Sequence, residues 1–394
     1  MKALILLFFC SFFVLFYNYV GYGLLLYILV RCKRAFSRKQ TLPASPMPEV
    51  TLVIAAYNEE DFIARKIQNT LELDYPEDKL KVIMITDGST DRTPDIIRPY
   101  KRVQLMHQPE RNGKTAALNR AMQEVDTPIV VFCDANTLLN KAAILHLVKH
   151  YEDPTIGGVA GEKKVLQGEN DGAAGMEGVY WKYESTLKKL DAALYTVVGA
   201  AGELFSIRTA LYQPVEQDVI LDDFIISLRI AQAGYRIAYA PDAYAMEAPS
   251  FSIAEEHKRK VRISAGGFQS IIKLAPLLNI FKYPLLSFQY ISHRVLRWTL
   301  SPLSLPVMLI TNALLVWNGM GGWYLLMLVA QVAFYLLAIG GYFLATRSIK
   351  IKIFYIPFYF LFMNVAIYEG FFRYIRKRQS AVWEKAARST AAVS

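Results

Sequence analysis

The sequence predicts an α/β fold with a Rossmann-like, mostly parallel sheet, flanked at both ends by transmembrane α-helices. Four short, almost wholly apolar runs between residues 50 and 133 indicate strands buried on both faces, which is typical of a parallel sheet covered by helices. Helical patterns separate these runs, so that strand–helix–strand units follow one another. Long uncharged segments near both ends of the chain indicate the membrane helices.

The composition agrees with a membrane protein that carries one substantial soluble domain. The 394 residues are 54% hydrophobic and only 20% charged, which is too apolar for an ordinary soluble enzyme. The net charge is +10, but the basic residues gather beside the apolar runs, at 31–39 and 373–378. Because such clusters are typical of cytoplasmic flanks that touch anionic lipid, we expect membrane lipid as a partner and no nucleic acid.

The elements of the soluble domain follow from the apolar runs and from the polar patterns between them. The expected strands span 50–56, 82–86, 103–107 and 129–133, and the expected helices span 59–72, 91–99 and 114–125. The last helix follows the turn sequence Asn112-Gly113. A further helix is expected at 223–234, where Asp222 is in position to cap its first turn.

The first membrane segment spans residues 3–30, which are almost uncharged and end at Arg31. A secretory signal would have a shorter apolar core with its positive charge in front. We therefore expect a retained helix whose C-terminal end faces the cytoplasm. Asn18 interrupts this apolar run, and we expect it to pack against another helix.

Three apolar stretches follow the soluble domain, at about 299–317, 322–345 and 353–372. If all three cross the membrane, the basic tail lies outside, against the positive-inside rule. Either the last stretch is re-entrant or interfacial, or the rule fails, and we favour a cytoplasmic tail. The expected organisation is a transmembrane helix at 1–31, the soluble domain at 49–266, amphipathic interfacial helices at 267–298, transmembrane helices at 299–375 and a basic tail at 376–394.

Polar side chains follow the expected strands at the edge where ligands bind in such sheets. Carboxylates there suit a divalent cation and ribose hydroxyls, while Lys and Arg neutralise phosphate oxygens. The pattern therefore predicts a site for a nucleotide diphosphate and its cation. The residues are 57–60 (YNEE) after the first strand, 87–91 (DGSTD) after the second, 111–114 (RNGK) after the third and 134–136 (DAN) after the fourth.

Each of these motifs alone also fits an ordinary structural role. Residues 58–60 suit the first turn of a helix, and 87–89 and 112–113 are common turn sequences. Their coincidence at the ends of consecutive strands favours the ligand site.

In these stretches the chain resembles the membrane-bound branch of the inverting family 2 glycosyltransferases, which have the GT-A fold. The resemblance runs from residue 50 to about 269, and the order and the gaps of the motifs are those of the family. It implies an enzyme that uses a nucleotide sugar and is related to the polysaccharide synthases. The stretches are 53–60 (VIAAYNEE), 86–91 (TDGSTD), 112–119 (NGKTAALN), 134–136 (DAN), 221–223 (LDD), 227–229 (SLR) and 233–236 (AGYR).

The resemblance implies a donor-binding role for several of the matching residues. Tyr57, Glu59 and Asp87 would hold the base and ribose, and Lys114 would lie near the diphosphate. Asp134 would bind Mg²⁺ or Mn²⁺ through the phosphates. Asn136 stands where the family usually has a second Asp, and its amide oxygen can still ligate a hard cation, although without charge.

The resemblance also places catalysis at the adjacent pair Asp222 and Asp223. Asp223 would be the general base that deprotonates the acceptor hydroxyl, and the charge of Asp222 raises the pKa of such a neighbour. The small-residue sequence 199–203 (GAAGE) resembles the family's loop beneath the acceptor, with Gly199, Gly202 and Glu203 on the acceptor side. A plain tight turn is the alternative for this sequence.

Processive synthases of this branch carry a Gln-x-x-Arg-Trp motif, and the matching window here is 259–263 (RKVRI). Arg262 is retained, whereas Arg259 replaces the Gln and Ile263 replaces the Trp that would stack on the acceptor sugar. The departure weakens the case for retention of a growing polymer. The basic residues of the window could instead clamp a diphosphate, or form a basic helix face near anionic lipid.

The implied function is inverting transfer of a sugar, from a UDP-sugar, to a saccharide or lipid-linked acceptor at a bacterial inner membrane, with the catalytic domain in the cytoplasm. One alternative is a processive synthase that extrudes its own polymer, for which about four apolar runs are few. A non-catalytic scaffold would not need both Asp134 and Asp223. A nucleotide-driven transporter needs a phosphate-binding loop, but Gln108 stands where that loop requires glycine.

Overall fold

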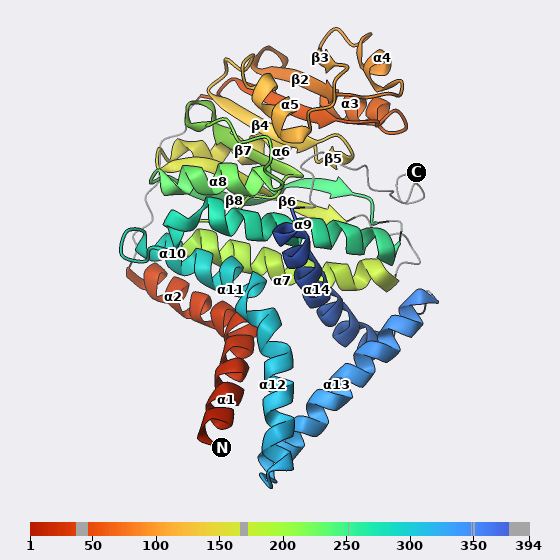
Figure 1. Ribbon diagram of the computed structural model, residues 1–394. Helices are drawn as coiled ribbons and strands as arrows, with labels where there is room; N and C mark the ends of the chain where they lie inside the picture. Colours follow the sequence, from red (N-terminus) through yellow and green to blue (C-terminus); the bar gives the residue numbers. More distant parts are fainter. Residues whose placement is uncertain (37–45, 166–171, 251, 348, 350, 378–394) are drawn as a thin grey trace.

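The computed structural model describes residues 1–36, 46–165, 172–250, 252–347, 349 and 351–377, and it describes no side chains for 172–180. The predictions that concern Arg38, Lys39 and the basic tail beyond residue 377 lie outside the described residues. An α/β domain forms one end of the molecule, and long helices extend from it at the other (Figure 1).

The α/β domain is built on one eight-stranded sheet in the order β3-β2-β1-β4-β7-β6-β8-β5. Strands β3, β2, β1 and β4 are parallel, whereas β7 is antiparallel to both β4 and β6. Strand β8 is parallel to β6, and β5 is antiparallel to β8. The strands are β1 Val50–Ala56, β2 Leu80–Asp87, β3 Gln104–Gln108, β4 Ile129–Asp134, β5 Thr137–Leu139, β6 Ile156–Val165, β7 Leu204–Arg208 and β8 Arg236–Glu247.

The helices of the domain cover both faces of the sheet, because alternate residues of a strand point to opposite sides. On β1, Leu52 and Ile54 join one buried cluster, whereas Val53 and Ala55 join the other. A strand that is buried on both faces must be apolar throughout, which explains the unbroken run at 50–56. The helices are α3 Ile63–Leu71, α4 Thr93–Ile97, α5 Lys114–Ala121, α6 Ala143–Val148, α7 Gly172–Leu194, α8 Asp222–Gln232 and α9 Ile253–Lys273.

Two sequence predictions need correction in this domain. The helix expected at 59–72 is α3, which begins only at Ile63, because the φ of 52° at Asn58 is not that of a right-handed helix and residues 60–62 form a turn. Asp222 is the first residue of α8 and not its cap. Leu221 holds the cap position, and no capping side-chain hydrogen bond is seen there among the described residues.

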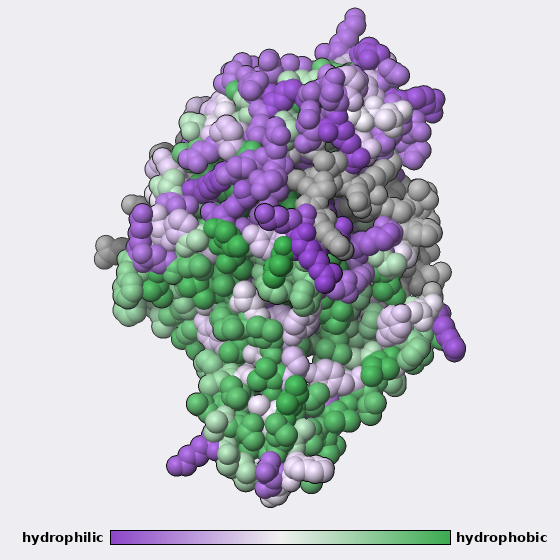
Figure 2. Space-filling view, viewed as in Figure 1, coloured by the Kyte–Doolittle hydropathy of each residue, from purple (hydrophilic) through white to green (hydrophobic). Residues whose placement is uncertain are grey.

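Within the described residues, four helices are long and apolar enough to span a membrane, and the hydrophobic, green surface in Figure 2 lies over this part of the molecule. The first was expected as one helix over 3–30, but α1 Lys2–Phe16 and α2 Tyr22–Phe36 are joined by a π-helical turn at Tyr17–Gly21 and point in different directions (Figure 1). The others are α12 Leu300–Trp317, α13 Trp323–Thr346 and α14 Lys352–Ile375.

The bend of the first helix is fixed by Asn18, which is fully buried in the π-helical turn. Its side chain donates a hydrogen bond of 2.6 Å to Ser301 Oγ at the start of α12, which confirms that it packs against another helix. Beyond the bend, α2 lies along α7, where Leu26 and Val30 pack with Leu187 and Leu194. The second half of the first apolar run therefore packs on the α/β domain.

The last apolar helix, α14, also packs on the α/β domain, along α9. Near its start, Tyr355 and Phe358 form a cluster with which Ile253 of α9 packs. Near its end, Gly370 lies so close to α9 that an added Cβ would be 2.5 Å from Ser264 Cβ. Helix α14 therefore contacts α9 near both of its ends, while its course relative to a membrane stays a prediction.

The junction between the α/β domain and the membrane helices is formed by α7 and α9 together with short segments. These segments are α10 Pro284–Tyr290, a π-helical turn at Ile291–Val295 and α11 Leu296–Trp298. Figure 1 shows α7 and α9 as a layer between the sheet and the long helices.

Candidate active site

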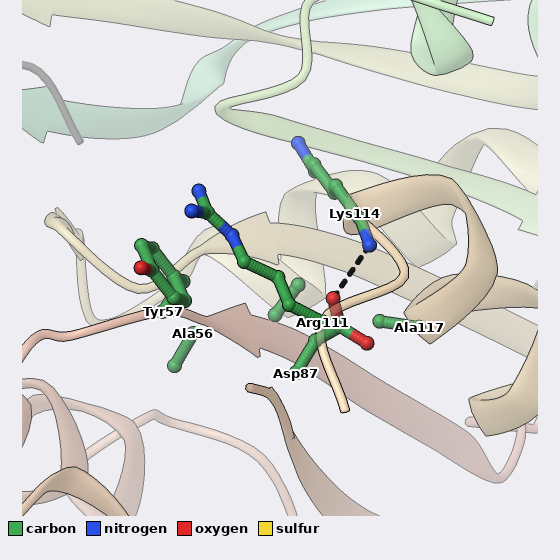
Figure 3. Close-up of a pocket in the computed structure, with 8 residues that line it drawn as sticks. Ala56, Tyr57, Asp87, Arg111, Lys114 and Ala117 are labelled. Atoms are coloured by element: carbon green, nitrogen blue, oxygen red, sulfur yellow. Dashed lines mark hydrogen bonds between the residues drawn. The ribbon is translucent and has the colours of Figure 1, made fainter. Parts of the chain in front are cut away.

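A cavity lies at the carboxyl ends of β1 and β2, beside the point where the strand order changes direction between β1 and β4. In doubly wound sheets, this is where ligands bind. The cavity is lined by Ala55, Ala56, Tyr57, Asp87, Arg111, Gly113, Lys114 and Ala117 (Figure 3).

Asp87, the last residue of β2, is buried in this cavity with one oxygen engaged and the other open. Its Oδ2 accepts hydrogen bonds from the backbone N–H groups of Asn112 (2.9 Å) and Gly113 (2.6 Å). Within the described part of the chain, Oδ1 has no hydrogen-bond partner, although it is buried. Since a buried polar atom without a partner is costly, Oδ1 is available to a ligand's hydroxyl or N–H group.

Tyr57 follows β1, and its ring forms a second wall of the cavity. The guanidinium of Arg111 lies over this ring, 3.8 Å from its centre, as Figure 3 shows. Stacked aromatic and guanidinium planes suit a flat, electron-rich heterocycle. The pair therefore forms a surface on which a nucleobase can stack.

Lys114, the first residue of α5, links the cavity to two acidic groups. Its ammonium donates a hydrogen bond of 2.7 Å to Asp134 Oδ1 at the end of β4 and lies 4.0 Å from Asp222 Oδ2 at the start of α8. Burial lowers the pKa of Lys114, but the charges of Asp134 and Asp222 outweigh this effect and raise it overall. Lys114 therefore carries its charge at neutral pH.

Asp223 faces the same centre from α8. Burial, and then the charge of Asp222, raise the pKa of Asp223 to about 7. A Cβ placed on Gly202 would lie 3.5 Å from Asp223 Oδ2 and 3.5 Å from Lys114 Nζ, so the absence of a side chain at 202 leaves room beside both groups. A carboxylate that titrates near neutrality beside open space is suited to accept a proton from a hydroxyl.

The residues at the end of β4 fit a divalent cation in part. Burial raises the pKa of Asp134, although Lys114 opposes the shift. Two residues on, Asn136 Oδ1 is buried and lacks a hydrogen-bond partner among the described residues. Those residues hold no group of three His, Cys, Asp or Glu side chains suited to a metal. A cation here would thus depend on oxygens of the donor as well as on Asp134 and Asn136.

The loop before β7 carries the three residues predicted on the acceptor side. Gly199 has a φ of 85°, and a Cβ there would lie 2.1 Å from the Phe224 ring, so its role in the loop is steric. Glu203 pairs with Lys163 at 2.7 Å and with Arg259 at 3.4 Å. Burial raises the pKa of Glu203, but these two cations lower it well below its usual range overall.

Three predicted donor-binding residues, Asp134, Glu59 and Arg262, are not among those that line the cavity, although Asp134 contacts Lys114, which does. Glu59 is buried in the turn after β1, at 5% exposure. Arg262 lies on α9, one turn before Gly266, where α9 contacts Ile220 and Leu221 just ahead of α8. The contact of Arg262 with a donor stays a prediction, as does that of Glu59.

Sequence reasoning missed Arg111 as an individual site residue, although its basic loop was recognised. It also missed Lys163 and Glu247, which form an ion pair behind Glu203. No local motif marks Lys163 or Glu247, because β6 and β8 bring them together from distant parts of the chain. Helix α7 was not predicted either, and the 199–203 loop lies between this helix and β7.

Taken together, the sheet and its site define a GT-A α/β domain. A mannosyltransferase of Pyrobaculum calidifontis, solved in complex with GDP-Man and Mn²⁺, shares this fold with a TM-score of 0.70 at 23% identity. The similarity covers 95% of this chain and 100% of that one, which confirms the predicted fold class.

Sequence comparison identifies the family that the first part of the α/β domain matches. The family model described as Glycosyl transferase family 2 matches residues 51–213. The poly-beta-1,6-N-acetyl-D-glucosamine synthase of Staphylococcus aureus (strain MSSA476) is 24% identical over 258 residues, and that of Staphylococcus epidermidis is 22% identical over 231 residues. Residues 51–213 therefore form a family 2 glycosyltransferase domain that is related to the polysaccharide synthases, and the apolar helices of the described residues are long enough to span a membrane.

The similarity to these relatives is partial. It covers 63% of this chain and 61% of the Staphylococcus aureus protein, and 57% of this chain and 56% of the Staphylococcus epidermidis protein. The matched part therefore spans less than two thirds of the relatives' own length.

Proposed function

We propose that the protein transfers a sugar, with inversion, from a nucleotide sugar to a saccharide or lipid-linked acceptor at the membrane. We further propose UDP as the nucleotide and the cytoplasmic face of a bacterial inner membrane as the location. The observation that carries the proposal is the convergence of Lys114, Asp134 and Asp223 on the space left open by Gly202. The match of residues 51–213 to the family 2 glycosyltransferases supports glycosyl transfer as the reaction.

In this proposal the donor nucleotide lies in the cavity at the carboxyl ends of β1 and β2. Its base stacks on Tyr57 and Arg111, and a ribose hydroxyl donates to the open Oδ1 of Asp87. Lys114 neutralises the diphosphate as it leaves, since its ammonium lies where charge develops. Asp134 and Asn136 hold Mg²⁺ or Mn²⁺, which supplies further charge stabilisation to the leaving diphosphate when bound.

The acceptor hydroxyl approaches from the side of Gly202. Asp223 accepts its proton as the oxygen forms a bond to the anomeric carbon and the bond to the nucleotide diphosphate breaks. With a pKa near 7, about half of the Asp223 side chains are ionised at neutral pH, and the rest retain the proton. The reaction is therefore expected to speed up as the pH rises through this value.

A donor panel tests this function. Purified full-length protein in detergent is mixed with UDP-, GDP- and dTDP-sugars, Mg²⁺ or Mn²⁺ and a membrane extract, and release of the nucleotide is measured. We expect release from a UDP-sugar that depends on the cation and on the extract. If a GDP- or dTDP-sugar alone is used, the proposal of UDP is wrong, and if no donor is used, the proposed transfer is wrong.

A second candidate is a processive synthase that makes and extrudes a polymer, which the match to poly-N-acetylglucosamine synthases favours. Ile263 stands where processive synthases have a Trp that stacks on the acceptor sugar, and this argues against retention of a growing polymer. Product size separates the two candidates. A single added sugar supports the first, whereas long chains from one encounter support the second.

A further inference from the structure

The turn that carries Asp134 and Asn136 joins β4 to β5, and side chains of α3 hold the residues on either side of it. Within the turn, the hydroxyl of Thr137 donates a hydrogen bond of 3.0 Å to the carbonyl of Asp134. Asp134 is the last residue of β4, and Thr137 is the first residue of β5. The positions of Asp134 and Asn136 therefore depend on the contacts that fix this short segment.

Lys66 of α3 holds both ends of the turn. Its amino group donates a hydrogen bond of 2.8 Å to the carbonyl of Thr137, which follows the turn. The same amino group donates a hydrogen bond of 3.0 Å to the Sγ of Cys133, which precedes it. All three side chains are buried, and that of Lys66 is 0% exposed. One amino group thus bridges the two ends of the segment that contains Asp134 and Asn136.

A lysine is a costly residue at this position. Among the described residues, the hydrogen-bond partners of the Lys66 amino group are one carbonyl and one sulfur atom. Burial of an amino group costs free energy, which such hydrogen bonds return only in part. An apolar side chain of similar length would avoid this cost. The presence of lysine favours a role in the geometry of the turn over a role in stability alone.

The far end of β5 is held separately, by Asn69 of the same helix. The side-chain amide of Asn69 donates a hydrogen bond of 2.9 Å to the carbonyl of Leu139, and its oxygen accepts one of 2.8 Å from the N–H group of Leu139. Helix α3 therefore has two anchor points on this part of the chain. The anchor at Lys66 flanks Asp134 and Asn136, whereas the anchor at Asn69 lies beyond them.

We propose that Lys66 is a positioning residue of the cation site, which holds the turn so that Asp134 and Asn136 can bind the cation together. This inference rests on the proposed function, in which these two residues hold Mg²⁺ or Mn²⁺. The buried Oδ1 of Asn136, which lacks a hydrogen-bond partner among the described residues, is consistent with a ligand held ready. Residues that orient metal ligands without touching the metal contribute strongly to its affinity.

The test measures Mn²⁺ binding to the full-length protein in detergent with UDP present, from the loss of the free-ion signal in electron paramagnetic resonance. Lys66→Met removes the amino group at similar volume. We expect this variant to bind Mn²⁺ about 10- to 100-fold more weakly than the wild type. Its affinity for UDP in EDTA, measured by calorimetry, should stay within about threefold, because Lys66 is not among the residues that line the donor cavity.

Two further variants separate positioning from a general loss of stability. Arg65→Met changes the exposed neighbour of Lys66 on α3 and should bind Mn²⁺ within about twofold of the wild type. Asn69→Ala removes the other anchor, so it should lower the melting temperature but keep Mn²⁺ affinity within about threefold. Equal Mn²⁺ binding by Lys66→Met and Arg65→Met would overturn the proposal. An equal loss of affinity in Asn69→Ala and Lys66→Met would also overturn it, since the role of Lys66 would then be structural only.

Should Lys66→Met not fold, Lys66→Gln has a shorter side chain that cannot span both acceptors. The same loss of Mn²⁺ affinity is expected for it, and unchanged affinity would overturn the proposal.

The result is separable from that of the transfer assay. If Mn²⁺ binding depends on Lys66 but no donor releases nucleotide, the proposed transfer fails and the positioning role stands. If nucleotide release depends on Asp223 but Lys66→Met binds Mn²⁺ as the wild type does, the further inference fails alone. Transfer that needs no cation, by a protein that binds no Mn²⁺, would overturn both the cation site and the role of Lys66.

Discussion

Replacement of Asp222 by Asn provides a direct test of the raised pKa at Asp223. The two carboxyl groups are adjacent on α8, and the charge of Asp222 is the largest cause of the raised pKa after burial. As a general scale, two unit charges about 8 Å apart interact by roughly 2 kcal/mol at an effective dielectric constant of about 20, which is somewhat more than one pKa unit. Asp222→Asn should therefore lower the pKa of Asp223 from about 7 toward about 6.

The assay is kcat/KM as a function of pH between 5 and 9. Asp223 acts as a base only when deprotonated, so activity should rise with pH and reach half its plateau near pH 7 in the wild type. In Asp222→Asn the same rise should occur about one pH unit lower. Asp242→Asn, on an exposed residue, is the control and should leave the profile unchanged. An active Asp222→Asn variant with an unshifted profile would refute this account of the site.

Three other predictions concern metal, backbone and donor. Asp134→Ala should reduce kcat/KM about 100-fold or more. EDTA should abolish the activity of the wild type until Mg²⁺ or Mn²⁺ is restored. If the Asp134→Ala variant and the EDTA-treated wild type both stay active, the metal role is excluded. Gly199→Ala should lower the free energy of unfolding by about 2–5 kcal/mol, because the φ of Gly199 is 85° and a Cβ would overlap Phe224. Gly202→Ala should melt at the same temperature as the wild type but transfer sugar slowly. The reverse pattern in thermal melts and transfer rates would contradict these steric assignments. Arg111→Ala should raise the KM for the donor about tenfold through lost base stacking, with kcat within about twofold, and an unchanged KM would place the base elsewhere.

The first half of the α/β domain could be predicted from sequence because its signals are local. A strand buried on both faces is an apolar run, and β1 Val50–Ala56 was predicted at its observed bounds. The residues that follow parallel strands must meet at one edge, so the position of Asp87 near the 111–114 loop followed from the order of the elements.

The second half depends on contacts between distant segments. Lys163 of β6 pairs with Glu247 of β8, and Trp181 of α7 contacts Lys260 of α9, although nothing in their neighbouring residues marks them. The bend at Tyr17–Gly21 was missed for a similar reason. Hydropathy detects an apolar run, whereas the bend depends on the hydrogen bond from Asn18 to Ser301.

Transfer by the Asp223→Asn variant is the most direct test of the central claim. The variant and the wild type are incubated with a labelled UDP-sugar, Mn²⁺ and membrane extract, after equal UDP binding has been established by titration. The account predicts that the variant binds UDP as tightly as the wild type and transfers sugar at least about a thousandfold more slowly, because it lacks the base. Equal transfer by the two proteins would show that Asp223 is not the base and that the site has been assigned wrongly.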